Sequence, residues 1–124
     1  MNLRNRMHNS SNPYQGKAKK VLCVCSAGLL RSPTLAWVLS NDPWNYNTRA
    51  AGSSASHALI PVDEVLLGWA DLVVFVNKEN YEETASRFDL STVKTLVLDV
   101  PDAYGFRSEE LVDLLKEICD EVKI

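Results

Sequence analysis

Four short apolar runs alternate with four segments of helical pattern, and this alternation constrains the fold more than any other feature. The run KVLCVC is apolar on both faces, as expected of a central strand that helices cover on each side. The pattern predicts an α/β fold with an open, parallel, four-stranded sheet and helices on both faces, in three layers. Strands are expected over 20–25, 48–52, 71–76 and 93–100, and helices over 31–40, 61–70, 77–88 and 108–122.

The 124 residues suffice for one domain with a hydrophobic core and are too few for two ordinary ones. Residues 1–18 are polar and basic and are expected to form a disordered tail, which leaves a single α/β domain over 19–124. The first 20 residues hold five basic residues and no acidic one, so eight basic and sixteen acidic residues remain in the rest. Such an acidic body is a poor general nucleic-acid binder. No apolar run approaches the roughly 20 residues that span a bilayer, so no membrane association is expected.

The chain has three cysteines, an odd number that makes a poor disulfide framework. This usage suits a reducing compartment, and a cytoplasmic location is expected. Cys23 and Cys119 are interpreted as packing residues, with Cys119 near the edge of the apolar stripe of the last helix. Trp37 and Trp69 fall on apolar helical stripes and are expected in the core.

The stretch VLCVCSAGLLRSPT places a cysteine and an arginine five residues apart, where the first strand turns into a helix. In an open parallel sheet, ligands bind beyond the carboxyl ends of the strands. The N–H groups of this loop and the helix N-terminus meet there and favour an anion. The helix, the Arg31 guanidinium and the Ser32 hydroxyl would stabilise a Cys25 thiolate. Because the same groups can hold phosphoryl oxygens, the stretch predicts a nucleophilic cysteine in a phosphate-binding loop.

A simpler interpretation makes Cys25 a small buried apolar residue and Arg31 a surface charge. The position of the pair, at a strand end and before a helix, favours the functional interpretation. The sequence contains neither a zinc-type Cys/His cluster nor a dinucleotide glycine pattern. Neither a metal nor a cofactor is therefore expected.

The stretch VLCVCSAGLLRSPTLA resembles the phosphate-binding loop of the low-molecular-weight protein tyrosine phosphatases. Further along, AAGSSASH is similar to their Ser-Ala-Gly segment and following histidine, ADLVVFVNKEN to their third strand and its turn, and DVPDAYGF to their acid loop. The resemblance covers roughly Lys20 to Val122 and is strongest to a shortened bacterial or phage-type branch. It implies a phosphatase-like domain with strand order 2-1-3-4.

The resemblance also implies a role for each residue that matches. Cys25 would attack phosphorus, Arg31 would bind the phosphoryl group, and Ser32 would support the thiolate. Asp102 would protonate the leaving oxygen and then activate water to hydrolyse a phosphocysteine intermediate. The residues implied for substrate binding are Ser26, Ala27, Gly28, Leu29, Leu30, Ser32 and Tyr104. The expected activity is hydrolysis of phosphomonoesters of the phosphotyrosine type, on a phosphorylated protein or a small molecule.

Several positions depart from the family pattern. Gly28 stands where an asparagine usually braces the loop, and Leu30 stands where many members have a second cysteine. Ser56 and Gly105 replace aromatic residues of the family, which reduces the aromatic rim for phosphotyrosine to Tyr104. The reaction type survives these changes better than the substrate does.

Alternatives remain open at the level of sequence. Asp99 competes with Asp102 for the role of general acid and is expected to bind loop amides instead. His57 matches a histidine that braces a loop in the family. The cysteine loop also resembles that of the IIB components of sugar phosphotransferase systems, which carry phosphocysteine without hydrolysing it, and a catalytically inactive phosphate-binding module is a further alternative. Arsenate reduction needs further cysteines downstream, and only Cys119 is available. The oligomeric state is left open.

Overall fold

A computed structural model describes residues 18–26, 31–54, 58, 60–100, 109–122 and 124. The strands are β1 (Lys20–Cys25), β2 (Asn47–Gly52), β3 (Leu72–Phe75) and β4 (Thr95–Val97). The helices are α2 (Arg31–Leu39), α3 (Glu64–Trp69), α4 (Lys78–Ala85) and α5 (Glu109–Val122). Strands and helices alternate as predicted. The tail predicted over 1–18 lies outside the described residues apart from position 18.

The four strands form one parallel sheet in the order β2-β1-β3-β4, which confirms the predicted fold. β1 lies inside the sheet, with Cys23 paired to Ala50 on one side and to Val74 on the other. This position explains why KVLCVC is apolar without alternation, because a central strand is covered on both faces.

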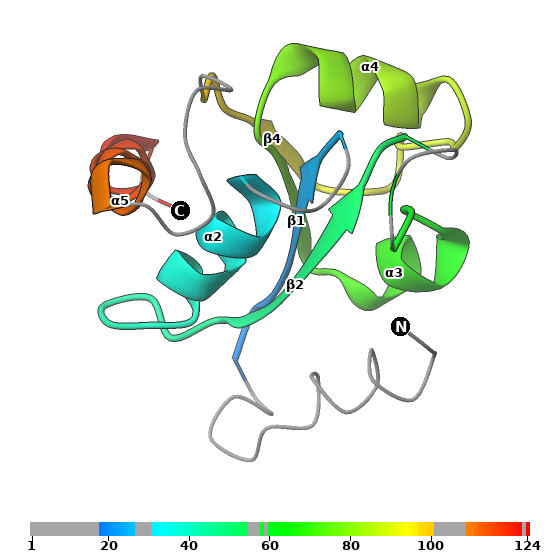
Figure 1. Ribbon diagram of the computed structural model, residues 1–124. Coiled ribbons are helices and arrows are strands. Elements are labelled where there is room, and N and C mark those ends of the chain that lie inside the picture. Colours follow the sequence, from blue (N-terminus) through cyan, green and yellow to red (C-terminus); the bar gives the residue numbers. More distant parts are fainter. Residues whose placement is uncertain (1–17, 27–30, 55–57, 59, 101–108, 123) are drawn as a thin grey trace.

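The helices cover both faces of the sheet, α2 and α5 on one and α3 and α4 on the other (Figure 1). Side chains of β1 alternate between the two cores: Val21, Cys23 and Cys25 pack under α2 and α5, and Leu22 and Val24 pack under α3 and α4. The domain therefore has the three layers that the sequence predicts.

Two local predictions are wrong. α3 begins at Glu64 with Asp63 as its N-cap, not at Pro61, because Pro61 forms a bridge to Gly52 and continues the extended chain. Trp37 is 40% exposed and is not a core residue. Leu35 and Leu39 define the buried face of α2, and Trp37 lies about 200° around the helix from Leu35.

The carboxyl ends of the strands are tied together by backbone hydrogen bonds just beyond the sheet. The N–H of Ser53, after β2, donates to the Cys25 carbonyl at 2.8 Å. The N–H of Val76, after β3, donates to the Val24 carbonyl, and the N–H of Val100, after β4, donates to the Val76 carbonyl, both at 2.9 Å. The segments that follow all four strands thus meet at one edge, where ligands bind in sheets of this kind.

None of the helices in the described part of the chain combines the length and the apolar character needed to cross a membrane.

Candidate active site

Cys25 ends β1 and is only 3% exposed. Its Sγ lies 3.1 Å from Oγ of Ser32, which occupies the first turn of α2. The Ser32 hydroxyl also lies 3.3 Å from the carbonyl of Ala51, which can only accept a hydrogen bond. The Ser32 hydroxyl proton therefore has two alternative acceptors, Cys25 Sγ and the Ala51 carbonyl. If Cys25 is a thiolate, the hydroxyl should donate to Sγ, because hydrogen bonds to ionised groups are stronger than those to a neutral carbonyl.

Arg31 is the first residue of α2 and is 4% exposed. One guanidinium nitrogen, Nη1, donates to the carbonyl of Val100 at 3.0 Å. This contact uses one of the five N–H donors of the side chain. A buried arginine thus links the start of α2 to the segment that follows β4.

The structure brings together four of the predicted site residues, Cys25, Ser26, Arg31 and Ser32. The other predicted site residues lie outside the described residues, and they are Ala27, Gly28, Leu29, Leu30, Asp102 and Tyr104. His57 and Ser56 lie outside them too. Asp99 is exposed, and the amides of residues 101–108 lie outside the described residues, so its expected hydrogen bonds to loop amides stay a prediction.

A polar network next to Ser26 was not predicted. Asn80, in α4, is fully buried, and its Nδ2 lies 3.0 Å from Oγ of Ser26 and 3.3 Å from Oγ of Ser53. Ser53 in turn donates to the carboxylate of Glu83, one turn further along α4. The polar sequence of residues 77–88 predicts an exposed helix. The structure instead buries two of its side chains, Asn80 and Thr84.

The other two thiols are inert by their environment. Burial raises the pKa of Cys23 well above its usual value, and the neighbouring Cys119 and Cys25 add to the effect. Burial also raises the pKa of Cys119 to about 12. Both thiols therefore stay protonated at neutral pH, which agrees with the packing role predicted for them. Cys119 lies at the centre of the buried stripe of α5, with Leu111 and Leu115, and not at its edge.

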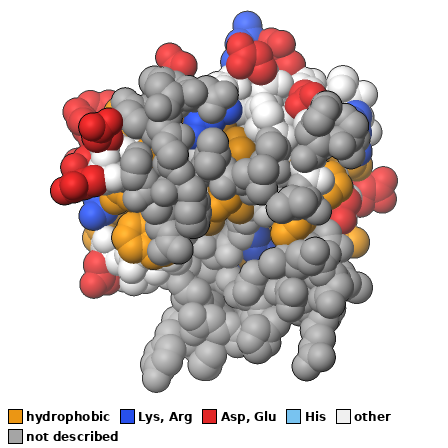
Figure 2. Space-filling model, viewed as in Figure 1, with side chains coloured by type: hydrophobic (Ala, Val, Ile, Leu, Met, Phe, Trp, Pro, Cys, Tyr) orange, Lys and Arg blue, Asp and Glu red, His pale blue; other side chains and the backbone are white. Residues whose placement is uncertain are grey.

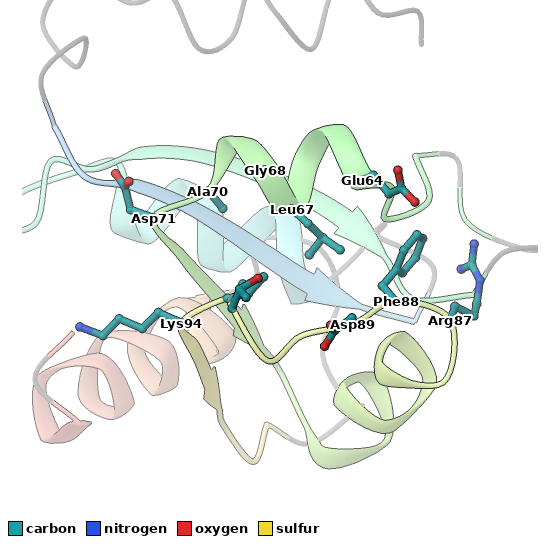
Figure 3. A pocket seen from close by; sticks show the side chains of 11 residues that line it. Glu64, Leu67, Gly68, Ala70, Asp71, Arg87, Phe88, Asp89 and Lys94 are labelled. Carbon is teal, nitrogen blue, oxygen red and sulfur yellow. The ribbon is translucent and has the colours of Figure 1, made fainter.

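A cavity of about 650 Å³ lies between α3 and the segment that leads from α4 to β4. Asp71 and Lys94 line one end of it, and Glu64, Arg87 and Phe88 line the other (Figure 3). Its lining contains none of the predicted site residues. Because Asp71 and Lys94 directly precede β3 and β4, this cavity begins at the amino ends of the strands, which is the wrong edge for catalysis in such a sheet.

Acidic side chains gather at the margins of the molecule (Figure 2). They come mainly from the exposed faces of α4 and α5, which carry Glu79, Glu82, Glu83, Glu109, Glu110, Asp113, Glu117, Asp120 and Glu121. The described surface agrees with the acidic body expected from the sequence. In this same part of the chain, no group of three His, Cys, Asp or Glu side chains is placed to hold a metal ion.

Comparison with solved structures shows which fold this is. A protein tyrosine phosphatase from Entamoeba histolytica in a product-state mimic superposes with a TM-score of 0.67 at 20% identity, covering 86% of this chain and 94% of that one. Vibrio vulnificus Wzb in complex with benzylphosphonate superposes with a TM-score of 0.65 at 21% identity, covering 86% of this chain and 95% of that one. A YwlE arginine phosphatase variant with a phosphorylated active-site serine superposes with a TM-score of 0.62 at 22% identity, covering 84% of this chain and 95% of that one.

These similarities confirm the resemblance to the low-molecular-weight phosphatases at the level of the fold. No protein-family model matches the chain, and no curated protein matches it in sequence.

Proposed function

We propose that this protein is a cysteine-dependent phosphatase that hydrolyses phosphomonoesters through a phosphocysteine intermediate. The observation that carries the proposal is the 3.1 Å contact between Cys25 Sγ and Ser32 Oγ, at the carboxyl end of β1 and beside the buried Arg31. The Ser32 hydroxyl can donate to Sγ, and the start of α2 with the buried Arg31, the residue before Ser32, supplies positive charge that would favour an anionic substrate.

The reaction has two displacement steps. In the first, the Cys25 thiolate attacks phosphorus, the bond from phosphorus to the ester oxygen breaks, and Asp102 gives its proton to that oxygen. In the second, water attacks the phosphorus of the phosphocysteine and Asp102 takes a proton from that water. The P–S bond breaks, which releases phosphate and the Cys25 thiolate. Arg31 holds the phosphoryl oxygens in both steps, because its planar guanidinium matches two of them at once.

An aryl phosphate of the phosphotyrosine type is the proposed substrate class. Relatives in fold support it, since one is titled a protein tyrosine phosphatase and another binds benzylphosphonate, an aromatic ring on a phosphonate. Tyr104 would contact the ring. A third is titled an arginine phosphatase, so phosphoarginine belongs among the substrates to be compared.

The setting proposed for this activity is a single domain over 19–124 in the cytoplasm, with no nucleic-acid partner. The three cysteines are free thiols, as a reducing compartment allows, and the acidic surface of α4 and α5 disfavours a polyanion.

The test is to mix the purified chain with p-nitrophenyl phosphate, measure p-nitrophenol release, and analyse quenched samples by mass spectrometry. We expect many turnovers per molecule and a phosphoryl group on Cys25 during turnover. A carrier of the IIB type would keep its phosphocysteine and release one equivalent of product at most. An inactive module would bind phosphate and release no product at all.

Ser32→Ala should lower the reactivity of Cys25. The hydroxyl is the donor closest to Sγ among the described contacts, and a hydrogen bond to a charged group is worth about 1.5–3 kcal/mol. We expect the rate of Cys25 alkylation by iodoacetamide at neutral pH to fall about 10-fold or more. Ser91→Ala, at an exposed serine, is the matched control and should alkylate at the wild-type rate. An unchanged rate in Ser32→Ala would exclude this role for its hydroxyl.

A further inference from the structure

Four side chains form a hydrogen-bonded series from α4 to the residue next to the nucleophile. Asn80 Nδ2 lies within hydrogen-bond distance of both Ser26 Oγ and Ser53 Oγ, and Ser53 Oγ bonds the carboxylate of Glu83. Asn80 and Ser53 are fully buried, whereas Ser26 and Glu83 reach the surface. The series therefore runs from an exposed charge, through the interior, to the first residue after Cys25.

The donors and acceptors in this series can be assigned in one way. An ionised carboxylate only accepts, so the single proton of Ser53 goes to Glu83. The Ser53 oxygen must then accept from Asn80, which orients the amide nitrogen of Asn80 toward the two serines. Ser26 Oγ accepts the second N–H of that amide, so the hydroxyl proton of Ser26 is directed away from Asn80.

This orientation has a cost. With its nitrogen facing the serines, Asn80 leaves Oδ1 buried and without a hydrogen-bond partner among the described residues. An unpaired buried polar atom destabilises the folded state, so an apolar residue at this position of α4 would favour folding. A buried polar group of this kind calls for an explanation other than stability.

The backbone of Ser26 is fixed by the same elements. Its carbonyl accepts from the N–H of Ser54 at 2.9 Å, and the carbonyl of Cys25 accepts from the N–H of Ser53 at 2.8 Å. The segment after β2 thus holds the main chain at Cys25 and Ser26, and Asn80 holds the Ser26 side chain. The position of Ser26 relative to the thiol is therefore determined from two directions.

We propose that Asn80 is a positioning residue that acts through Ser26, holding its hydroxyl as a donor to an anion bound at Cys25. Ser53 and Glu83 set the direction of the series, so that Ser26 presents a proton and not a lone pair. The proposal rests on the proposed phosphatase function, because the anion is the phosphoryl group of the substrate. A hydroxyl with a preset orientation stabilises developing negative charge without having to reorganise.

Two truncations and their combination test it. Asn80→Ala and Ser26→Ala should each lower kcat/KM for p-nitrophenyl phosphate and weaken inhibition by inorganic phosphate, about 10- to 100-fold. The double variant should lose little more than either single variant, because both changes remove the same donor. Glu82→Gln is the matched control on the same helix. Glu82 is exposed and pairs only with Lys78 in the described contacts, so kcat/KM should stay unchanged.

The outcomes separate this inference from the proposed function. Losses that multiply in the double variant, or wild-type kcat/KM in Ser26→Ala, would overturn the positioning role. Ser26 is exposed, so that variant stays informative if Asn80→Ala fails to fold. A wild-type chain without turnover would overturn the phosphatase proposal alone. The positioning role would then be tested by calorimetric binding of inorganic phosphate, with the same variants and the same expected pattern.

Discussion

Cys25→Ser should abolish turnover of p-nitrophenyl phosphate, with a fall in kcat of about 10⁴-fold or more. A serine hydroxyl stays protonated at neutral pH and is a poor nucleophile without an adjacent base. Phosphate should still bind with a similar dissociation constant, because Arg31 and the start of α2 remain in place. The measurements are steady-state kinetics and calorimetric titration with inorganic phosphate.

Cys23→Ala is the matched control for this substitution. Cys23 lies two residues earlier on β1, faces the same core and is fully buried, and its raised pKa keeps it from acting as a nucleophile. Its replacement should lower the melting temperature and leave kcat near the wild-type value. If Cys25→Ser kept most of its activity, or if Cys23→Ala lost it, the assignment of the nucleophile would be wrong. A slowly formed phosphoserine in Cys25→Ser, as in the YwlE variant, would support the assignment.

The sequence predicts the position of Cys25 well because local patterns decide it. An unbroken apolar run predicts a central strand, and the Arg-Ser-Pro sequence after the loop predicts a helix start, since proline at this position needs no N–H partner. Both predictions hold, with β1 at Lys20–Cys25 and α2 beginning at Arg31. Parallel strands then require that Cys25 lies at the edge where the other strands end.

Asn80 could not be found in the same way. Its helix has a polar sequence, and such a pattern favours an exposed face. The contacts that bury it lie 54 residues away at Ser26 and 27 residues away at Ser53, so they exist only in the folded sheet. The contact between Arg31 and the Val100 carbonyl, across 69 residues, is also invisible to local pattern. Long-range polar contacts, and not secondary structure, are what the sequence leaves undetermined at this site.

That arginine contact bears on the general acid. Val100 lies three residues beyond the end of β4, and its carbonyl is bonded to the side chain expected to hold the phosphoryl group. Asp102 comes two residues later in the sequence, and Asp99 comes one residue earlier and is exposed. Asp102 lies outside the described residues, so its role as proton donor rests on the resemblance and on the substitution experiment that follows.

Asp102→Ala should slow the hydrolysis of phenyl phosphate about 10²- to 10⁴-fold, and that of p-nitrophenyl phosphate far less. The reason is the leaving group: p-nitrophenolate is stable as an anion, whereas phenolate needs a proton as the P–O bond breaks. Asp99→Ala is the matched control, since it removes a neighbouring carboxylate that is exposed, and both rates should stay near wild type. The measurement is kcat for both variants over a series of aryl phosphates with leaving groups of rising basicity. A steeper dependence in Asp99→Ala with an unchanged one in Asp102→Ala would reverse the assignment, and no change in either would show that leaving-group protonation comes from another residue.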